Sequence, residues 1–126
     1  MKLFIYQHCP FCVRAQMIVG LKNMPVETAV IMEGDAETPT RMVGRKVVPI
    51  LQKDDGSYMP ESLDIVHYID ALKAPQVASG TVDPTIEAWC KGISGSIFEL
   101  AVPRFTKADF AELATTEARE AFRQRE

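Results

Sequence analysis

Residues 2–12 read KLFIYQHCPFC and decide the fold, because an apolar run leads directly into a Cys-x-x-Cys motif. The run at residues 2–6 is typical of a buried strand. After Phe11 the apolar residues recur at helical spacing, and Pro10 suits the first turn of a helix, where no amide donor is needed. We therefore predict a strand, followed by a helix that opens at the cysteines and ends near Asn23.

The patterns up to residue 72 complete one α/β domain. Residues 26–31 form a second β-rich run, parallel to the first strand. Thr38 and Pro39 predict the cap and first position of a short helix that stops near Gly44. The remaining predicted elements are a strand at 47–52, a turn at Asp54-Asp55-Gly56, a strand from Tyr58, and a helix from about Glu61 with Ile65, Val66, Ile69 and Leu72 inward. The order β-α-β-α-β-β-α predicts a four-stranded mixed sheet against helices.

The second half of the chain reads as a linker and helices. Residues 73–83 lack periodicity and predict a linker, and residues 84–126 a helical part. Asp83 and Pro84 open a long helix that we expect to end before Pro103, followed by a shorter helical pattern at 105–113 and a last segment capped by Thr115 or Thr116. The apolar face of the long helix comprises Ile86, Trp89, Ile93, Ile97 and Leu100.

Composition narrows the function classes. The 126 residues carry a formal charge of −3, which makes a general nucleic-acid binder unfavourable. The chain lacks an apolar run of the roughly 18 residues that a membrane span requires. We therefore expect a cytoplasmic protein without membrane association. Three cysteines in such a protein favour thiol chemistry or metal binding over a disulfide framework.

The strongest chemical signal is the pair Cys9 and Cys12. At a strand-to-helix junction Cys9 lies at the helix N-terminus, where the dipole and free amides stabilise a thiolate. A thiolate is the attacking species in disulfide exchange, and Cys12 lies within reach to close a disulfide. We predict redox chemistry and expect no metal. The alternatives are inert packing and half of a zinc site, for which Cys90, His8 and His67 supply no second close pair.

Two further sequence features predict a ligand-binding site. Pro49 interrupts a strand pattern, and a cis peptide would turn the backbone of Val48 toward the cysteines, where it could pair with an extended ligand. Glu61 and Ser62 sit at a helix N-terminus, which favours a ligand carboxylate, and Glu61 can pair with an ammonium group. An edge-strand proline and a plain helix cap are the structural alternatives. A ligand that carries both groups at one end matches the γ-glutamyl part of glutathione.

The other candidates are ambiguous from sequence. His8 could bias the pKa of Cys9 or be merely exposed, and His67 is expected to be structural. Cys90 is expected to be a small core residue. Three cations could attract the glycine carboxylate of glutathione, although solvated surface is the more ordinary interpretation: Arg14, Arg41 and Lys22.

The chain resembles bacterial glutaredoxin 2, the glutaredoxin type with a glutathione-transferase-like architecture. The matching stretches are residues 8–12 (HCPFC), 20–23 (GLKN), 36–44 (AETPTRMVG), 48–55 (VPILQKDD), 59–62 (MPES) and 103–105 (PRF). The resemblance implies a thioredoxin-like N-terminal domain and an all-helical C-terminal domain. It also implies reduction of mixed disulfides with glutathione as electron donor. The implied glutathione-binding residues are Cys9, Phe11, Val48, Pro49, Glu61 and Ser62.

Two departures from the family pattern affect what is expected. Phe11 stands where many glutaredoxins have tyrosine, which keeps an aromatic platform, so activity should survive. The chain stops at Glu126, within the helical domain, so we expect the family's remaining helices to be absent. A helix that is apolar over a wide stripe needs a partner. We therefore expect self-association through the helices of the second part.

Two other functions remain open. A glutathione transferase shares the fold and the ligand site, but needs a donor that stabilises the glutathione thiolate rather than a second cysteine. A non-enzymatic module would bridge an iron-sulfur cluster between two chains through the first cysteine and glutathione. The leading prediction is a glutathione-dependent oxidoreductase that acts on glutathionylated or disulfide-bearing proteins through Cys9, with Cys12 as resolving thiol.

Overall fold

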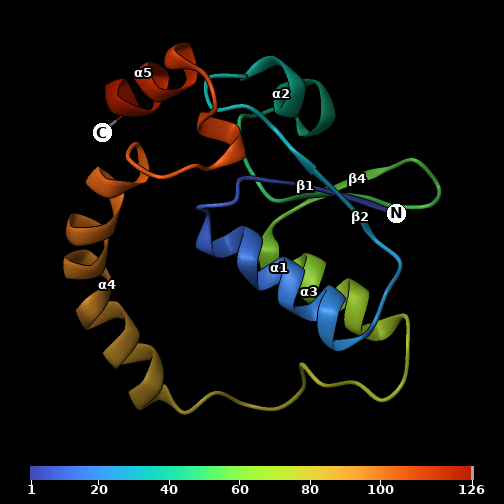
Figure 1. Cartoon of the computed structure of the whole chain (residues 1–126). Helices are drawn as coiled ribbons and strands as arrows, with labels where there is room; N and C mark the ends of the chain where they lie inside the picture. Colours follow the sequence, from blue (N-terminus) through green and yellow to red (C-terminus); the bar gives the residue numbers. More distant parts are fainter. Residues whose placement is uncertain (126) are drawn as a thin grey trace.

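The computed structural model describes residues 1–125 and contains one sheet with helices on both sides (Figure 1). The elements in chain order are β1 (Lys2–Ile5), α1 (Pro10–Leu21), β2 (Glu27–Val30), α2 (Glu37–Val43), β3 (Ile50–Gln52), β4 (Tyr58–Pro60), α3 (Ser62–Ala71), α4 (Pro84–Phe105), the 3₁₀ turn η1 (Ala111–Leu113) and α5 (Thr116–Arg125). The order up to α3 confirms the predicted β-α-β-α-β-β-α arrangement.

The four-stranded mixed sheet has the order β2-β1-β3-β4. Strands β1 and β2 are parallel, whereas β3 is antiparallel to both of its neighbours, β1 and β4. Helices α1 and α3 lie side by side on one face, and α2 lies on the other side (Figure 1). The buried core between sheet and helices comprises Leu3, Ile5, Cys12, Ala15, Ile18, Leu51, Ile65 and Ile69. Cys12 therefore belongs to the core that anchors α1 to the sheet.

Helix α2 and strand β3 begin elsewhere than the sequence predicts. Helix α2 starts at Glu37, and the amide of Thr38 donates to the Asp35 carboxylate at 2.9 Å. Pro39 then lies within the first turn, where amides have no intrahelical acceptor. Strand β3 starts only at Ile50. Pro49 has no amide hydrogen to donate to a neighbouring strand, so ladder pairing begins after it.

A buried ion pair fixes the start of the linker. Lys22 Nζ lies 3.0 Å from Asp70 Oδ1, and both side chains are 3% exposed. The Asp70 carboxylate also accepts from the amides of Val77 and Ala78. The Val77 amide is the largest influence that holds the pKa of Asp70 below its usual value. The expectation that Lys22 is solvated or faces a ligand is therefore wrong, because its partner comes from a distant helix.

The faces of α3 differ in part from the predicted pattern. Ile65 and Ile69 are fully buried as expected, but Leu72 follows the last helical residue and is 47% exposed. His67 lies exposed on the same helix, so the structural role expected for it is not supported. The helical repeat places His67 off the stripe that Ile65 and Ile69 occupy. Leu72 would continue that stripe, but it is exposed where the helix ends.

The second part departs further from the predicted pattern. Helix α4 continues through Pro103 to Phe105. Pro103 has no amide hydrogen to donate to the preceding turn, and the helix ends two residues after it. Residues 105–113 form no helix of their own, since the chain bends after α4 and makes only the short turn η1. Thr115 caps α5 as predicted, because its Oγ1 accepts from the Ala118 amide at 3.1 Å.

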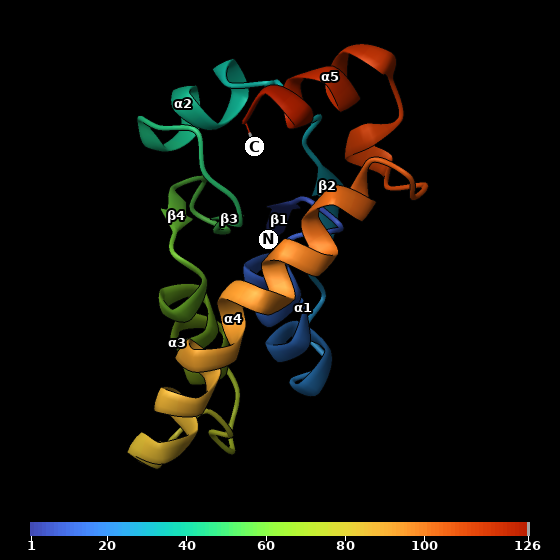
Figure 2. The same cartoon turned by 90° about the vertical axis from the view of Figure 1, so that its left-hand side faces the viewer.

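Helix α4 is largely uncovered, whereas α5 docks on the first domain (Figures 1 and 2). The side chains of Trp89 and Ile97 are 64% and 52% exposed, and Cys90 is exposed rather than in the core. Helix α5 approaches the loop after β2 so closely that a Cβ on Gly34 would lie 3.0 Å from the Ala121 Cβ. Across residues 1–125, each helix is too short or too polar to pass through a lipid bilayer.

Candidate active site

Cys9 lies at the end of the segment that connects β1 to α1. It is the N-cap residue of α1, with extended backbone, and Pro10 occupies the first helical position. Its amide donates to the Tyr6 carbonyl and its carbonyl accepts from the Val13 amide, which fixes the turn. The Cys9 side chain is partly exposed, whereas Cys12 is fully buried one turn further on. This arrangement makes Cys9 the accessible thiol of the pair.

The two thiols have opposite electrostatic environments. The Cys12 thiol donates a hydrogen bond to the Cys9 sulfur, and this is the main reason that the pKa of Cys9 falls to about 6. The amides of Cys12 and Phe11 add to the lowering, while partial burial opposes it. The same hydrogen bond and burial raise the pKa of Cys12 strongly. At neutral pH Cys9 is therefore a thiolate and Cys12 a thiol.

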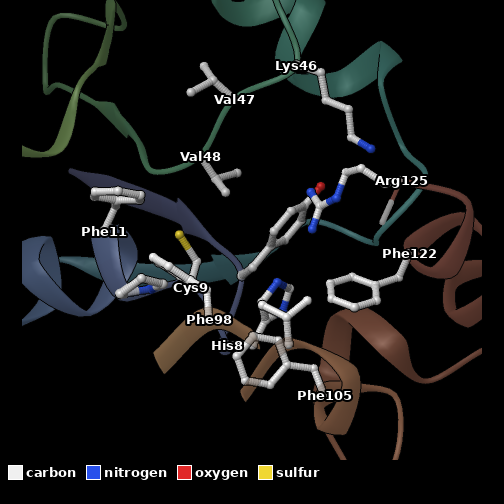
Figure 3. A pocket seen from close by; sticks show the side chains of 13 residues that line it. His8, Cys9, Phe11, Lys46, Val47, Val48, Phe98, Phe105, Phe122 and Arg125 are labelled. Atoms are coloured by element: carbon white, nitrogen blue, oxygen red, sulfur yellow. The ribbon is translucent and has the colours of Figure 1, made fainter. Parts of the chain in front are cut away.

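Two hollows share lining residues near Cys9. Figure 3 shows the first of them. The first, of about 380 Å³, contains Cys9 and is lined by residues from the segment after β1, from α1, from the segment before β3, and from α4 and α5. The second, of about 470 Å³, is lined by Phe11, Arg14, Val47, Val48, Pro49, Glu61, Ser62, Leu63 and Asp64. Phe11, Val47 and Val48 line both. The predicted site residues Cys9, Phe11, Val48, Pro49, Glu61 and Ser62 thus line one or both hollows, whereas Cys12 lies buried beneath Cys9.

The end of the second hollow is the N-terminus of α3. Glu61 is the N-cap residue and has a φ of 72°, an uncommon conformation for a residue with a side chain. The Glu61 carboxylate forms an ion pair with Arg45 at the surface. Ser62 is 8% exposed, and its Oγ accepts from Arg14 at 3.3 Å. Arg14 therefore lies at the Glu61 end of the second hollow, whereas Arg41 pairs with Glu37 on α2.

The peptide bond between Val48 and Pro49 is cis, as predicted. Val48 lies on the boundary between the two hollows, and Pro49 is buried beneath the second. The chain therefore passes between Cys9 and the α3 N-terminus at the position where an extended ligand would need a backbone partner.

Sequence reasoning missed how the C-terminal segment holds His8. Glu112 Oε1 accepts from the His8 amide at 2.9 Å and contacts His8 Nδ1 at 2.7 Å. The His8 ring is 7% exposed and packs against the rings of Tyr6, Phe105, Phe110 and Phe122. His8 is thus buried rather than exposed. Only the adjacency of His8 to Cys9 hinted at a role, because Glu112 lies 104 residues away.

Two cations next to Cys9 were also missed. Lys46 and Arg125 line the first hollow, and both contact the buried carboxylate of Glu33. The positive charge of Arg125 contributes to the lowered pKa of Cys9. Within the described part of the chain, no three His, Cys, Asp or Glu residues are grouped to hold a metal ion.

In a comparison with known proteins, the two parts of the chain match two different family profiles. The profile of the family "Glutathione S-transferase, N-terminal domain" matches residues 3–76. The chain belongs to this family. The profile "Glutaredoxin 2, C terminal domain" matches residues 85–126. Glutaredoxin 2 from Escherichia coli K12 is 56% identical over 97% of the chain, which spans 57% of that relative's length. The resemblance to glutaredoxin 2 is confirmed.

Solved structures of glutathione S-transferase relatives share the fold. Glutaredoxin 2 from Salmonella typhimurium, determined in complex with glutathione, superposes with a TM-score of 0.94 at 52% identity, covering 98% of this chain and 57% of that one. A Tau class glutathione S-transferase from mango has a TM-score of 0.58 at 22% identity, covering 98% of this chain and 56% of that one. The second likeness concerns the fold alone.

We predict that Cys12→Ala raises the pKa of Cys9 from about 6 toward the ordinary thiol value, because it removes the donor with the largest effect. The fraction of thiolate near pH 7 then falls. The measurement is the rate of Cys9 alkylation by iodoacetamide against pH, followed by mass spectrometry of the peptide. Cys90→Ala, on the exposed face of α4, is the control and should leave the midpoint unchanged. An unchanged midpoint in Cys12→Ala would mean that backbone amides alone stabilise the thiolate.

Proposed function

We propose that the chain is a glutathione-dependent thiol-disulfide oxidoreductase that reduces glutathionyl mixed disulfides and protein disulfides. The observation that carries this proposal is the thiolate of Cys9, hydrogen-bonded by the buried Cys12 thiol, at the edge of a hollow that ends at Glu61 and Ser62. A thiolate with a pKa near ambient pH is both abundant and nucleophilic. The likeness to a glutaredoxin 2 determined with glutathione supports the same ligand here.

The reaction begins when the Cys9 thiolate attacks the glutathione sulfur of a mixed disulfide. A bond forms between Cys9 and glutathione, the disulfide bond of the substrate breaks, and the substrate leaves as a thiolate that takes a proton from water. A second glutathione thiolate then attacks the glutathione sulfur on Cys9. Oxidised glutathione leaves and Cys9 returns to the thiolate. In balance, the mixed disulfide and one free glutathione become the substrate thiol and oxidised glutathione, so one disulfide is broken and one is formed.

Protein disulfides follow a second route that needs Cys12. Cys9 attacks one sulfur of the substrate and forms a mixed disulfide with the protein. Cys12 loses its proton, attacks Cys9 and releases the reduced substrate, which leaves a disulfide between Cys9 and Cys12. Two glutathione molecules then reduce this disulfide. The high pKa of Cys12 keeps it protonated while Cys9 carries negative charge, so the two thiols act in order.

We place glutathione along Val48 and Pro49, with its γ-glutamyl end at the N-terminus of α3. Ser62 Oγ and the free amides of the first turn would hold the carboxylate, and Glu61 the ammonium group. Arg14 lies beside Ser62 and adds a positive charge at that end. Phe11 lines both hollows and would cover the cysteine part of the ligand.

The site gives less support to the two alternative functions, a glutathione transferase and an iron-sulfur module. A conjugating enzyme needs the glutathione thiolate free, whereas the Cys9 and Cys12 pair is built to form disulfides. An iron-sulfur module needs only the first cysteine, so it gives the buried donor Cys12 no role. We further propose a cytoplasmic setting, where reduced thiols are maintained, with glutathionylated proteins as the partners.

We expect substitution of the two cysteines to have different effects on activity. Cys9→Ser should abolish reduction of a glutathionylated peptide. Cys12→Ser should retain it, because this route needs one protein thiol and the serine hydroxyl can still donate to Cys9, but should lose reduction of protein disulfides. The measurement is glutathione oxidation coupled to each substrate. If Cys12→Ser is as inactive as Cys9→Ser toward the glutathionylated peptide, the assignment of roles is wrong.

The glutathione placement is tested by Ser62→Ala. Loss of a hydrogen bond to a charged group costs roughly 1.5–3 kcal/mol, so glutathione affinity should fall about tenfold or more. The pKa of Cys9 should barely move. Calorimetric titration of glutathione into the wild type and the variant measures the change. Ser94→Ala on α4, outside both hollows, is the matched control. Equal affinities in wild type and Ser62→Ala would remove Ser62 from the site.

We also propose that the 126-residue chain pairs with a second copy through α4. The long exposed apolar side chains on this helix include Ile86, Trp89, Ile97, Phe98 and Leu100, each at least 44% exposed. Clusters of this kind favour association in water, and a symmetric pair buries the same face twice.

Light scattering during size-exclusion chromatography tests the pairing. The wild-type chain is expected to elute with the mass of a dimer. Replacing both Trp89 and Ile97 with serine should shift it to a monomer, because two large apolar groups leave the interface. Leu21→Ser removes an exposed leucine from α1 instead and should not change the mass. A dilute wild-type monomer that binds no apolar dye would contradict the proposal.

A further inference from the structure

The first hollow has a one-sided charge pattern. Its lining contains the two cations Lys46 and Arg125 and, among the described residues, no Asp or Glu. The rest of the wall is apolar or aromatic, with Phe98, Val102 and Phe105 from α4 opposite Val48. The second hollow, by contrast, is lined by Glu61 and Asp64 as well as Arg14. The two hollows therefore offer different groups to a ligand.

A buried carboxylate holds both cations of the first hollow. Lys46 Nζ lies 3.3 Å and an Arg125 guanidinium nitrogen 3.4 Å from the same oxygen of Glu33, whose side chain is 0% exposed. Arg125 also lies over the Phe122 ring, at 5.0 Å from its centroid. One carboxylate compensates only one of two positive charges, so the cluster of Lys46, Glu33 and Arg125 carries a net charge of +1. Figure 3 shows both cationic side chains reaching over the hollow from the side opposite Phe11.

The other ionisable groups near this hollow do not cancel that charge at its surface. Glu112 is fully buried, does not line the hollow, and is occupied by the amide and ring of His8. Cys9 is the remaining anion on the wall, and its charge is consumed when it attacks a disulfide. During the exchange this negative charge passes to the departing thiol, so Lys46 and Arg125 then face that thiolate and any carboxylate beside it.

We propose that Lys46 and Arg125 determine substrate specificity by selecting mixed disulfides whose leaving thiol carries a carboxylate near the sulfur, next to an apolar group. This inference rests on the proposed function. Glutathione that occupies the hollow of Glu61 and Ser62 leaves the hollow of Lys46 and Arg125 for the other half of the disulfide. That half departs as a thiolate, which the same cations also stabilise. The apolar wall of α4 covers the group that accompanies the carboxylate.

The test compares two glutathionylated peptides that differ in one charge, N-acetyl-Cys-Phe-Glu-amide and N-acetyl-Cys-Phe-Gln-amide. The full 126-residue chain reduces each with glutathione, and kcat/KM is measured for both. Partly exposed ion pairs are modest, so we expect a preference of roughly two- to fivefold for the glutamate peptide. The preference should reside mainly in KM and shrink as salt is raised from 0.02 to about 0.5 M, because salt screens exposed charges.

Variants assign the preference to the two cations. Arg125→Gln and Lys46→Gln should each reduce the ratio toward one, and Lys46→Arg should retain it. Arg123→Gln is the matched control, because Arg123 is an exposed arginine on the same helix that contacts Glu120 instead of the hollow. It should leave the ratio and the absolute rates unchanged. Lys46 lies outside α5, so its variants keep the test decisive if Arg125→Gln disturbs the helix.

Three results would overturn the inference. Equal kcat/KM for the two peptides in the wild type excludes selection of a carboxylate. A loss of rate that is the same for both peptides in Arg125→Gln and Lys46→Gln means that the cations act on glutathione or on the Cys9 thiolate and not on the leaving thiol. A ratio that survives in both variants excludes these residues. In each case the peptides are still reduced, whereas failure of the wild type to reduce either peptide contradicts the proposed function.

Discussion

The hydrogen bond from the buried Cys12 thiol to the Cys9 sulfur is the interaction on which the site depends. It requires Cys12 to be in the core beneath α1, so that its proton has no competing acceptor, and Cys9 to be at the cap, where the amides of Phe11 and Cys12 are free. Both conditions follow from a strand that ends one turn before a helix with proline at its first position. The fold therefore prepares the nucleophile before any ligand binds.

The chain after α4 contributes to the site as well as to the overall fold. Glu112 holds the amide and the ring of His8, the residue before Cys9. Two phenylalanine rings from this part, together with Phe105 at the end of α4, pack against the imidazole. A buried carboxylate without partners would be costly, so Glu112 and His8 constrain one another. The close approach of Ala121 to Gly34 fixes α5 on the first domain, which brings Arg125 to Glu33 and to the hollow of Cys9.

Local patterns in the sequence were sufficient for the order of the elements up to α3 and for the places of the predicted site residues at their ends. Cys9, Cys12, Val48, Glu61 and Ser62 each stand at a strand end or helix start that can be recognised from a few neighbouring residues. The pairs formed by distant segments could not be predicted this way. Lys22 looked solvated because Asp70 lies on another helix, and His8 looked exposed because the residues that bury it follow 97 to 114 positions later. The end of α4 was misplaced by two to three residues because the helix ends after Pro103 and not before it.

The charge difference between the two hollows favours one orientation of a bound glutathione over the reverse. Glutathione presents an ammonium and a carboxylate at its γ-glutamyl end, and only the hollow with Glu61, Ser62 and the α3 N-terminus offers partners for both. The hollow with Lys46 and Arg125 offers positive charge alone and would leave the ammonium group unpaired. Glutathione bound in reverse is therefore disfavoured at both ends. In the proposed placement, the same asymmetry that orients glutathione leaves the cationic side of Cys9 open to the departing thiol, so orientation and substrate choice would share one electrostatic cause.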